Sequence, residues 1–172
     1  MKTLSILLLL VGSSIMLTAQ AQNIPQVELK TPDGNNIMSS EIFDPATPTV
    51  VVFWKSGSNK CCDNLENMQA AWLEDLQQQG VKMVAICIGC NGTWSHVKPM
   101  ANGKNWEFEI YIDQNGDFKR AMNIANAPCT MLYDQNLQLL CRHNGYCTGN
   151  EDMICEKILF SLENPEQYTE AK

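Results

Sequence analysis

The stretch from residue 49 to residue 69 constrains the fold of this chain more than any other segment, because a buried strand there leads directly into a helix that begins with cysteines. Residues 50–54 form an uninterrupted apolar run rich in β-branched and aromatic side chains, which is typical of a strand covered on both faces. The residues after it predict one face of a helix that ends near residue 80, because they recur at steps of three and four. They are Cys61, Leu65, Met68, Trp72 and Leu76.

A cysteine at the start of this helix has chemical consequences. Cys61 falls within the predicted first turn, where unpaired backbone N–H groups and the helix dipole stabilise a thiolate and lower the thiol pKa. Burial against the preceding strand opposes ionisation. The two effects oppose each other, and a measured thiol pKa near or above the free value of about 8.5 would show that Cys61 is a poor nucleophile by itself.

The strand, turn and helix resemble the thioredoxin fold in its bacterial extracytoplasmic form, the TlpA-like thiol-disulfide oxidoreductases. That family has Phe-Trp, three residues, Cys, two residues and Cys here, where the first cysteine is the exposed nucleophile and the second resolves the mixed disulfide. Counted from Phe53 and Trp54, the first position is Ser58 and the second is Cys61, while Gly57 replaces a frequent aromatic residue. The motif is degenerate, and because exchange requires a thiolate, the ordinary two-cysteine cycle is impossible at this turn.

The resemblance implies an α/β, thioredoxin-like fold with a central mixed β-sheet flanked by helices and an N-terminal β-hairpin. Residues 27–38 have the pattern of that hairpin, with a turn built on Pro32, Asp33 and Gly34. Residues 81–88 form a second buried strand, which the crossover rule makes parallel to the first. The two strands therefore end at the same edge of the sheet, where open α/β folds place their chemistry.

The remaining helices and strands are predicted from turn-forming residues and from the spacing of apolar side chains. Ala127, Pro128 and Cys129 resemble the family's cis-proline site, in which the proline lies against the redox turn, and we expect Pro128 to lie close to Ser58. The predicted elements are a helical segment over 92–104 interrupted or restarted by Pro99, a strand over 106–112, a short helix over 117–122, antiparallel strands over 127–132 and 137–142, and a closing helix over 151–162.

Residues 1–21 read as a cleavable secretory signal, with Lys2, an apolar run and a terminal Ala-Gln-Ala. The run is broken by Gly12 and falls short of the roughly 20 residues of a membrane span. Residues 22–172 then form a single thioredoxin-like domain, with no membrane span after cleavage. Removal of Lys2 moves the formal charge from −7 to −8, and so acidic a surface disfavours nucleic acid and anionic membranes as partners.

All eight cysteines lie after the signal. Eight cysteines can pair fully in about 105 ways, and the sequence alone does not choose among them. Cys155 shares a helical face with Ile158, Leu159 and Leu162, so core packing is the better interpretation for it. Cys141 and Cys147 flank a short loop that a structural disulfide would close.

The pair Cys87 and Cys90 ends the second buried strand. Strand alternation turns Cys87 and Ile88 to opposite faces and leaves Cys90 in the loop beyond. In relatives of this fold an acidic residue often stands near the position of Cys90, so the resemblance places Cys90 near Cys61. Our hypothesis is that Cys90 replaces the lost nucleophile in space. The alternative is that Cys87 is core, Cys90 is an incidental loop thiol and the turn is inactive.

Further candidates surround the turn, whose predicted site residues are Trp54, Gly57, Ser58, Asn59, Lys60 and Cys62. Adjacent helical residues point about 100° apart, so Cys61 and Cys62 seldom bond each other, and one usually faces solvent or a second partner. Cys129 is a second candidate partner for Cys61 or Cys62. His96 and His143 are isolated in sequence and are read as ordinary polar residues.

Three functional classes fit the sequence. The first is an exported thiol-disulfide oxidoreductase, without a cofactor, that acts on protein thiols or disulfides of exported proteins and draws on a membrane or periplasmic reductant. The second is a redox-inactive module that binds a partner around Ser58 and Pro128. The third is a copper(I) or zinc carrier that uses Cys61, Cys62, Cys87 and Cys90. We rank them in this order and expect a periplasmic or secreted location.

Overall fold

The computed structural model describes residues 24–89, 94–147 and 149–164. The predicted signal peptide, residues 1–21, and Cys90 lie outside these ranges. The strands are β1 (Glu28–Lys30), β2 (Asn36–Met38), β3 (Thr49–Trp54), β4 (Lys82–Ile88), β5 (Glu109–Asp113), β6 (Cys129–Tyr133) and β7 (Leu139–Asn144). The helices are η1 (Ser39–Ile42), α1 (Asn59–Ala71), η2 (Trp72–Leu76), η3 (Gln77–Gln79), η4 (Trp94–His96), α2 (Val97–Gly103), α3 (Asp117–Ala121) and α4 (Asn150–Glu163).

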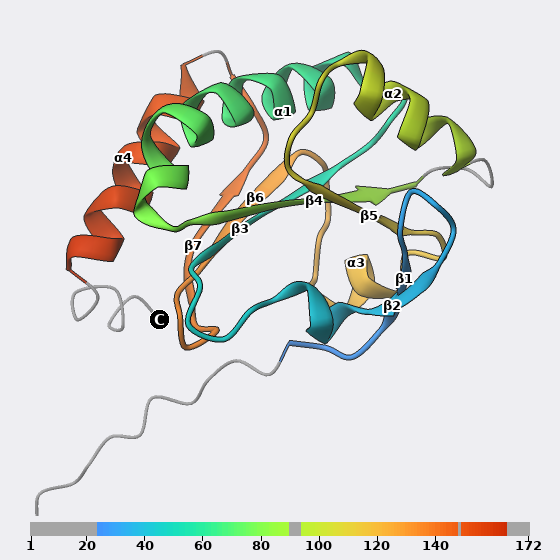
Figure 1. Ribbon diagram of the computed structural model, residues 1–172, viewed down its shortest axis with the longest axis horizontal. Helices are drawn as coiled ribbons and strands as arrows, with labels where there is room; N and C mark the ends of the chain where they lie inside the picture. The colour runs from blue at the N-terminus through green and yellow to red at the C-terminus, as the bar shows by residue number, and fades with distance from the viewer. Residues whose placement is uncertain (1–23, 90–93, 148, 165–172) are drawn as a thin grey trace, which may run out of the picture.

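The described strands form one mixed sheet with the order β2-β1-β5-β4-β3-β6-β7. Strands β3, β4 and β5 are parallel, whereas β6, β7 and the β1–β2 hairpin are antiparallel to their neighbours. Figure 1 shows α1, α2 and α4 over one face and α3 over the other. The predicted fold class, the parallel pairing of β3 with β4 and the place of the hairpin at one edge are confirmed.

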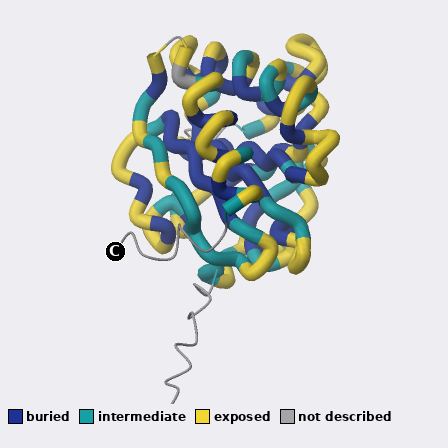
Figure 2. Tube along the Cα trace, turned by 90° about the vertical axis from the view of Figure 1, so that its left-hand side faces the viewer, coloured by how far each residue is buried: buried dark blue, intermediate teal, exposed yellow. Residues whose placement is uncertain are grey.

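Each face of the sheet carries its own apolar core. Val50, Val52 and Trp54 of β3 pack on the α1 face, and Val51 and Phe53 pack on the α3 face. Successive side chains of a strand point to opposite faces, which explains this alternation. Figure 2 shows the buried segments at the centre of the molecule. Both faces are covered, which explains why β3 and β4 read as continuous apolar runs rather than as alternating ones.

The helix after β3 continues as far as predicted. From α1 the chain passes through a π-helical turn, η2, and a 3₁₀ turn, η3, before Gly80 ends it in the left-handed conformation with φ 75°. Trp72 and Leu76 are buried, as predicted. The Trp72 indole Nε1 donates a buried hydrogen bond of 2.7 Å to the Val81 carbonyl oxygen, which fixes the start of β4 against the helix.

Two strand boundaries differ from the prediction because backbone groups find other partners. Trp106 and Glu107 were expected in a strand, but their N–H groups bond the Ala101 carbonyl oxygen and the Gln69 side chain, so β5 begins only at Glu109. Leu137 has φ 60° in a turn that delays β7. Within the described residues, no helix is both long and apolar enough to cross a membrane.

Candidate functional site

The turn between β3 and α1 is organised by Ser58. Its backbone is extended, with φ −117° and ψ 111°, and its hydroxyl accepts a hydrogen bond of 3.3 Å from the Cys61 N–H. Its carbonyl oxygen accepts from the N–H groups of Cys61 and Cys62 at 3.0 and 3.1 Å. Ser58 is therefore the N-cap of α1, and Cys61 lies in the first turn as predicted.

Both cysteines at this helix start are buried free thiols. Cys61 is 0% exposed and Cys62 is 8% exposed. One of the pair was expected to face solvent or a second partner, but neither faces solvent, because both pack in the core on the α1 face. Burial raises the pKa of the Cys62 thiol, and the Lys104 cation only partly opposes this shift. Neither thiol is presented to a substrate in this structure.

The outer surface of the turn is polar. Gly57, Asn59 and Lys60 are exposed, while Trp54 is fully buried beneath them. The Trp54 ring meets the Trp106 ring edge to face at a centroid distance of 5.2 Å. A partner approaching this turn meets backbone, an amide and an ammonium group before it meets sulfur.

The predicted cis-proline site is present beside the turn. The Ala127–Pro128 peptide bond is cis, and the Pro128 carbonyl oxygen accepts a hydrogen bond of 2.8 Å from the Gly145 N–H. Cys129, the next residue, pairs with Phe53 in the β3–β6 ladder. The proline thus stands at the end of β3 from which the Ser58 turn departs.

Cys87 lies at the C-terminal end of β4, level with Trp54 in the parallel register. It packs on the α1 face with Cys61 and Cys62, and Ile88 packs on the other face, as strand alternation predicts. Cys87 takes part in a disulfide. Its partner is not among the free cysteines, which are Cys61, Cys62, Cys129, Cys141, Cys147 and Cys155. Cys90 lies outside the described residues, so its pairing with Cys61 stays a prediction.

The structure corrects the second candidate pairing. Cys129 packs with Val51 and Phe53 on the α3 face, whereas Cys61 packs on the α1 face. The sheet separates the two thiols, because Cys129 shares the orientation of Phe53, its register partner. Burial raises the pKa of Cys129 and Arg142 partly opposes it. In this structure Cys129 is a core thiol and not a partner for Cys61 or Cys62.

The remaining cysteines lie towards the C-terminus. Cys155 is 3% exposed within the α1-face core, so its predicted packing role is confirmed. Cys141 is half-buried and Cys147 is exposed, and both are free. The structural disulfide expected between Cys141 and Cys147 is not formed here and stays a prediction.

Sequence reasoning missed two polar residues near the turn. The Asn64 side chain is 1% exposed, and neither its oxygen nor its nitrogen has a hydrogen-bond partner. Asn64 lies three residues after Cys61 and therefore on the same inward side of the helix, so this spacing predicts that it is buried. His96 Nε2 lies 2.7 Å from the Ser56 hydroxyl oxygen. No local pattern predicts that contact, since forty residues separate the two.

The soft-metal hypothesis gains no support from the geometry. Within residues 24–89, 94–147 and 149–164, no three side chains among His, Cys, Asp and Glu gather closely enough to hold a metal ion. One of the four proposed ligands, Cys87, is in a disulfide and so offers no thiolate in this state.

The fold and the cis-proline beside a capped helix start define a thioredoxin-like protein. The chain belongs to the AhpC/TSA family, whose sequence profile matches residues 21–141. No significant match was found among curated proteins.

Solved structures agree with this assignment. An uncharacterized thioredoxin-like protein from Porphyromonas gingivalis is 30% identical, with 81% of this chain and 92% of that chain covered and a TM-score of 0.70. StoA from Bacillus subtilis is 19% identical, covering 80% and 98%, with a TM-score of 0.62. A secreted Mycobacterium tuberculosis disulfide oxidoreductase is 15% identical, covering 78% and 96%, with a TM-score of 0.65. The last two show the shared fold.

Proposed function

We propose that this chain is an exported thioredoxin-like protein that exchanges thiols and disulfides with exported protein substrates. Cys61 is the proposed thiol at the helix start, and Cys90 is its proposed non-sequential partner. The observation that carries the proposal is the presence, in one core on the α1 face, of the reduced Cys61 and the oxidised Cys87. Such a molecule holds both reactants of an exchange at one edge of its sheet.

In the proposed internal step, the Cys61 thiolate attacks the Cys90 sulfur of a disulfide with Cys87. A Cys61–Cys90 bond forms, the bond to Cys87 breaks, and Cys87 leaves as a thiolate that takes up a proton. One disulfide is present before and after, so this step needs no external oxidant. The step moves the disulfide from the end of β4 to the start of α1.

The external step then follows ordinary exchange chemistry. A substrate thiolate attacks Cys61, forms a mixed disulfide and releases the Cys90 thiolate. The second substrate thiolate displaces Cys61, so the substrate gains a disulfide and the protein gains two electrons. The reverse order reduces a substrate disulfide. Because Cys61 is fully buried, either direction requires the first turn of α1 to open, and the Ser58 cap is the contact that opening breaks.

Disulfide mapping tests the pairing directly. Free thiols are counted in the native and denatured protein, and disulfide-linked peptides are identified by mass spectrometry before and after incubation with a dithiol peptide. We expect one disulfide that includes Cys87 at the start and a second species that links Cys61 to Cys90 during turnover. A protein in which Cys61 never enters a disulfide contradicts the proposed exchange.

Cysteine variants test the activity. We expect Cys61→Ala and Cys90→Ala to lose reduction of a model disulfide, because each removes one sulfur of the moving bond. Cys147→Ala is the control for removal of a thiol as such, since Cys147 is an exposed free thiol in the loop after β7 and has no part in the proposed exchange. Ser58→Cys restores the family's motif and serves as the positive control. Full activity of both Cys61→Ala and Cys90→Ala rules out the relocated pair.

Export has its own test. N-terminal sequencing of the protein recovered from the medium or periplasm is expected to show cleavage after Ala21. Recovery of the full-length chain only inside the cell contradicts the secretory part of the proposal without affecting the exchange chemistry.

A second function is favoured by a different observation. The turn buries both of its cysteines and exposes Lys55, Gly57, Asn59 and Lys60, which suits a redox-inactive module that binds a partner through this surface and Pro128. An inactive unmodified protein and a clearly active Ser58→Cys variant would support this alternative. The fold would then be competent for exchange and would lack only the nucleophilic thiol.

A further inference from the structure

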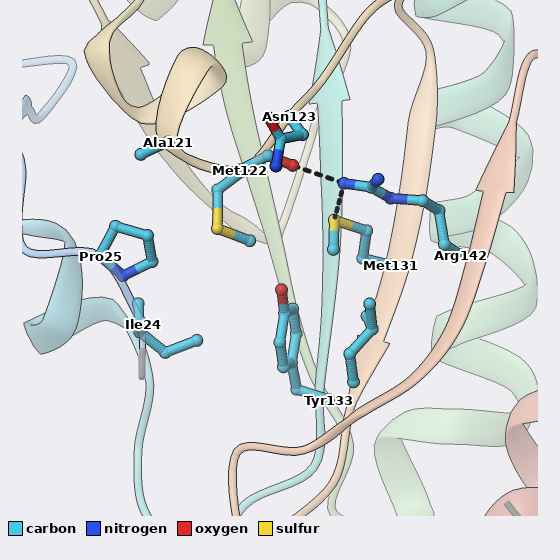
Figure 3. A pocket seen from close by; sticks show the side chains of 9 residues that line it. Ile24, Pro25, Ala121, Met122, Asn123, Met131, Tyr133 and Arg142 are labelled. Atoms are coloured by element: carbon cyan, nitrogen blue, oxygen red, sulfur yellow. Dashed lines mark hydrogen bonds between the residues drawn. The ribbon is translucent and has the colours of Figure 1, made fainter. Parts of the chain in front are cut away.

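A cavity on the α3 face lies apart from the thiols of the α1 face. It has a volume of about 160 Å³. Figure 3 shows it between the end of α3, strands β6 and β7, and the first described residues of the chain. Its lining combines apolar side chains with the polar groups of Asn123, Tyr133 and Arg142; the apolar residues are Ile24, Pro25, Ala121, Met122, Met131 and Leu139.

Arg142 brings a positive charge to this cavity and is fixed there by its neighbours. Its Nη2 donates a hydrogen bond of 2.5 Å to the Met122 carbonyl oxygen and lies 3.7 Å from the Met131 sulfur. A guanidinium has five N–H donors, so these contacts leave several unused. Arg142 takes part in none of the ion pairs found among the described residues.

Tyr133 supplies a second donor. The residue is 1% exposed, and Figure 3 shows its hydroxyl directed towards the space between Met122 and Met131. Among the described residues, no hydrogen bond of this hydroxyl is found. Burial raises the pKa of Tyr133, so the group stays protonated at neutral pH and can donate to an anion.

Size and charge together select a ligand class. A cavity of about 150 Å³ in another protein accommodates benzene, so this one fits a molecule of about six non-hydrogen atoms. The apolar side chains of the lining suit a short aliphatic chain, and a guanidinium outside any ion pair beside a tyrosine hydroxyl suits a carboxylate, which accepts from both. We propose that this cavity binds a small aliphatic monocarboxylate, with Arg142 and Tyr133 holding the carboxylate and Met122 and Met131 enclosing the chain.

Butyrate is the probe, and methionine methyl groups report on it. In the mature protein labelled with ¹³C-methyl methionine, we expect butyrate to shift the Met122 and Met131 signals saturably. The exposed Met38 and Met153 are expected to stay unchanged. n-Butanol has the same chain without the carboxylate and is expected to bind at least about tenfold more weakly, the equivalent of one charge-assisted hydrogen bond.

Variants separate the anion contact from simple filling of a void. Arg142→Gln is expected to weaken butyrate binding about tenfold or more, and Tyr133→Phe, which removes only the hydroxyl, to weaken it severalfold. Arg120→Gln, on the exposed side of α3, is the control and is expected to bind normally. Equal binding of butyrate and n-butanol to the unmodified protein, unchanged binding by a folded Arg142→Gln, or no saturable shift each overturns the proposal. The first and third results are decisive even where a variant does not fold.

Discussion

The Ser58 hydroxyl accepts a hydrogen bond from the Cys61 backbone N–H at 3.3 Å, so Ser58 caps the helix that carries Cys61 and Cys62. Serine is among the preferred N-cap residues because its short side chain reaches back to an unpaired N–H. Ser58 therefore has a structural role at the start of the helix. That role holds the first turn closed over a buried Cys61.

We expect Ser58→Ala to lower the free energy of unfolding by about 1 kcal/mol, the usual cost of losing an N-cap. Ser58→Asp is expected to retain the stability, because its carboxylate accepts the same hydrogen bond and favours the positive end of the helix dipole. Urea unfolding followed by circular dichroism measures both. Equal stability of Ser58→Ala and the unmodified protein shows that the cap contributes nothing.

Gly34 and Gly80 offer a matched pair of glycines with positive φ, 91° and 75°. A Cβ atom at Gly34 would lie 2.8 Å from the end of the Trp94 ring, whereas a Cβ atom at Gly80 would meet nothing within 4 Å. We expect Gly80→Ala to cost about 1–2 kcal/mol for backbone strain. Gly34→Ala is expected to cost about 1 kcal/mol more, because Trp94 must also give up packing.

A double-mutant cycle checks the origin of that difference. In a Trp94→Ala background the extra cost of Gly34→Ala should disappear, since the ring that the new methyl group meets is gone. An extra cost that persists there assigns the effect to the hairpin backbone instead.

Asn64 and Asn67 lie on the same helix, but we expect their replacement to change the stability of the protein in opposite directions. The buried Asn64 amide has no partner, whereas the Asn67 amide donates to the Tyr146 hydroxyl. We expect Asn64→Leu to raise the free energy of unfolding by about 1–3 kcal/mol, because it removes an unsatisfied buried amide of similar volume. Asn67→Leu is expected to lower it by about 1 kcal/mol. Thermal and urea unfolding of both variants measure the contrast, and marked destabilisation by Asn64→Leu contradicts it.

We expect the buried Cys155 thiol to make the free energy of unfolding depend on pH in the alkaline range. Burial raises its pKa to about 12 in the folded protein from a reference value of 9.0. The unfolded chain therefore releases a proton above pH 9 that the folded chain keeps, so stability falls as pH rises between about 9 and 12. For one such group the slope approaches about 1.4 kcal/mol per pH unit.

Urea unfolding under argon at pH 8 and pH 10.5 measures this loss. We expect Cys155→Val, which removes the ionisable group and keeps a similar volume, to lose about 1–2 kcal/mol less than the unmodified protein over that interval. The same pH dependence in both proteins assigns the alkaline loss to other groups.

The sequence by itself determined the architecture around β3 and α1. The apolar run of residues 50–54, the step of three and four from Cys61 to Leu76 and the strand-helix-strand order are governed by short-range periodicity and by the handedness of crossovers. For the same reason it predicted the hairpin and the burial of Trp72, whereas the proline just before β6 was predicted from the family resemblance. Such features depend on which residues are neighbours along the chain.

Only the tertiary structure decided where polar atoms and thiols meet across elements. Three findings depend on packing between segments far apart in sequence. Cys129 and Cys61 lie on opposite faces of the sheet, and β5 begins only at Glu109. Arg142 borders a cavity beside Tyr133. A side chain's partner is chosen by distance in space and by the hydrogen bonds left unfilled there, and no local period encodes either.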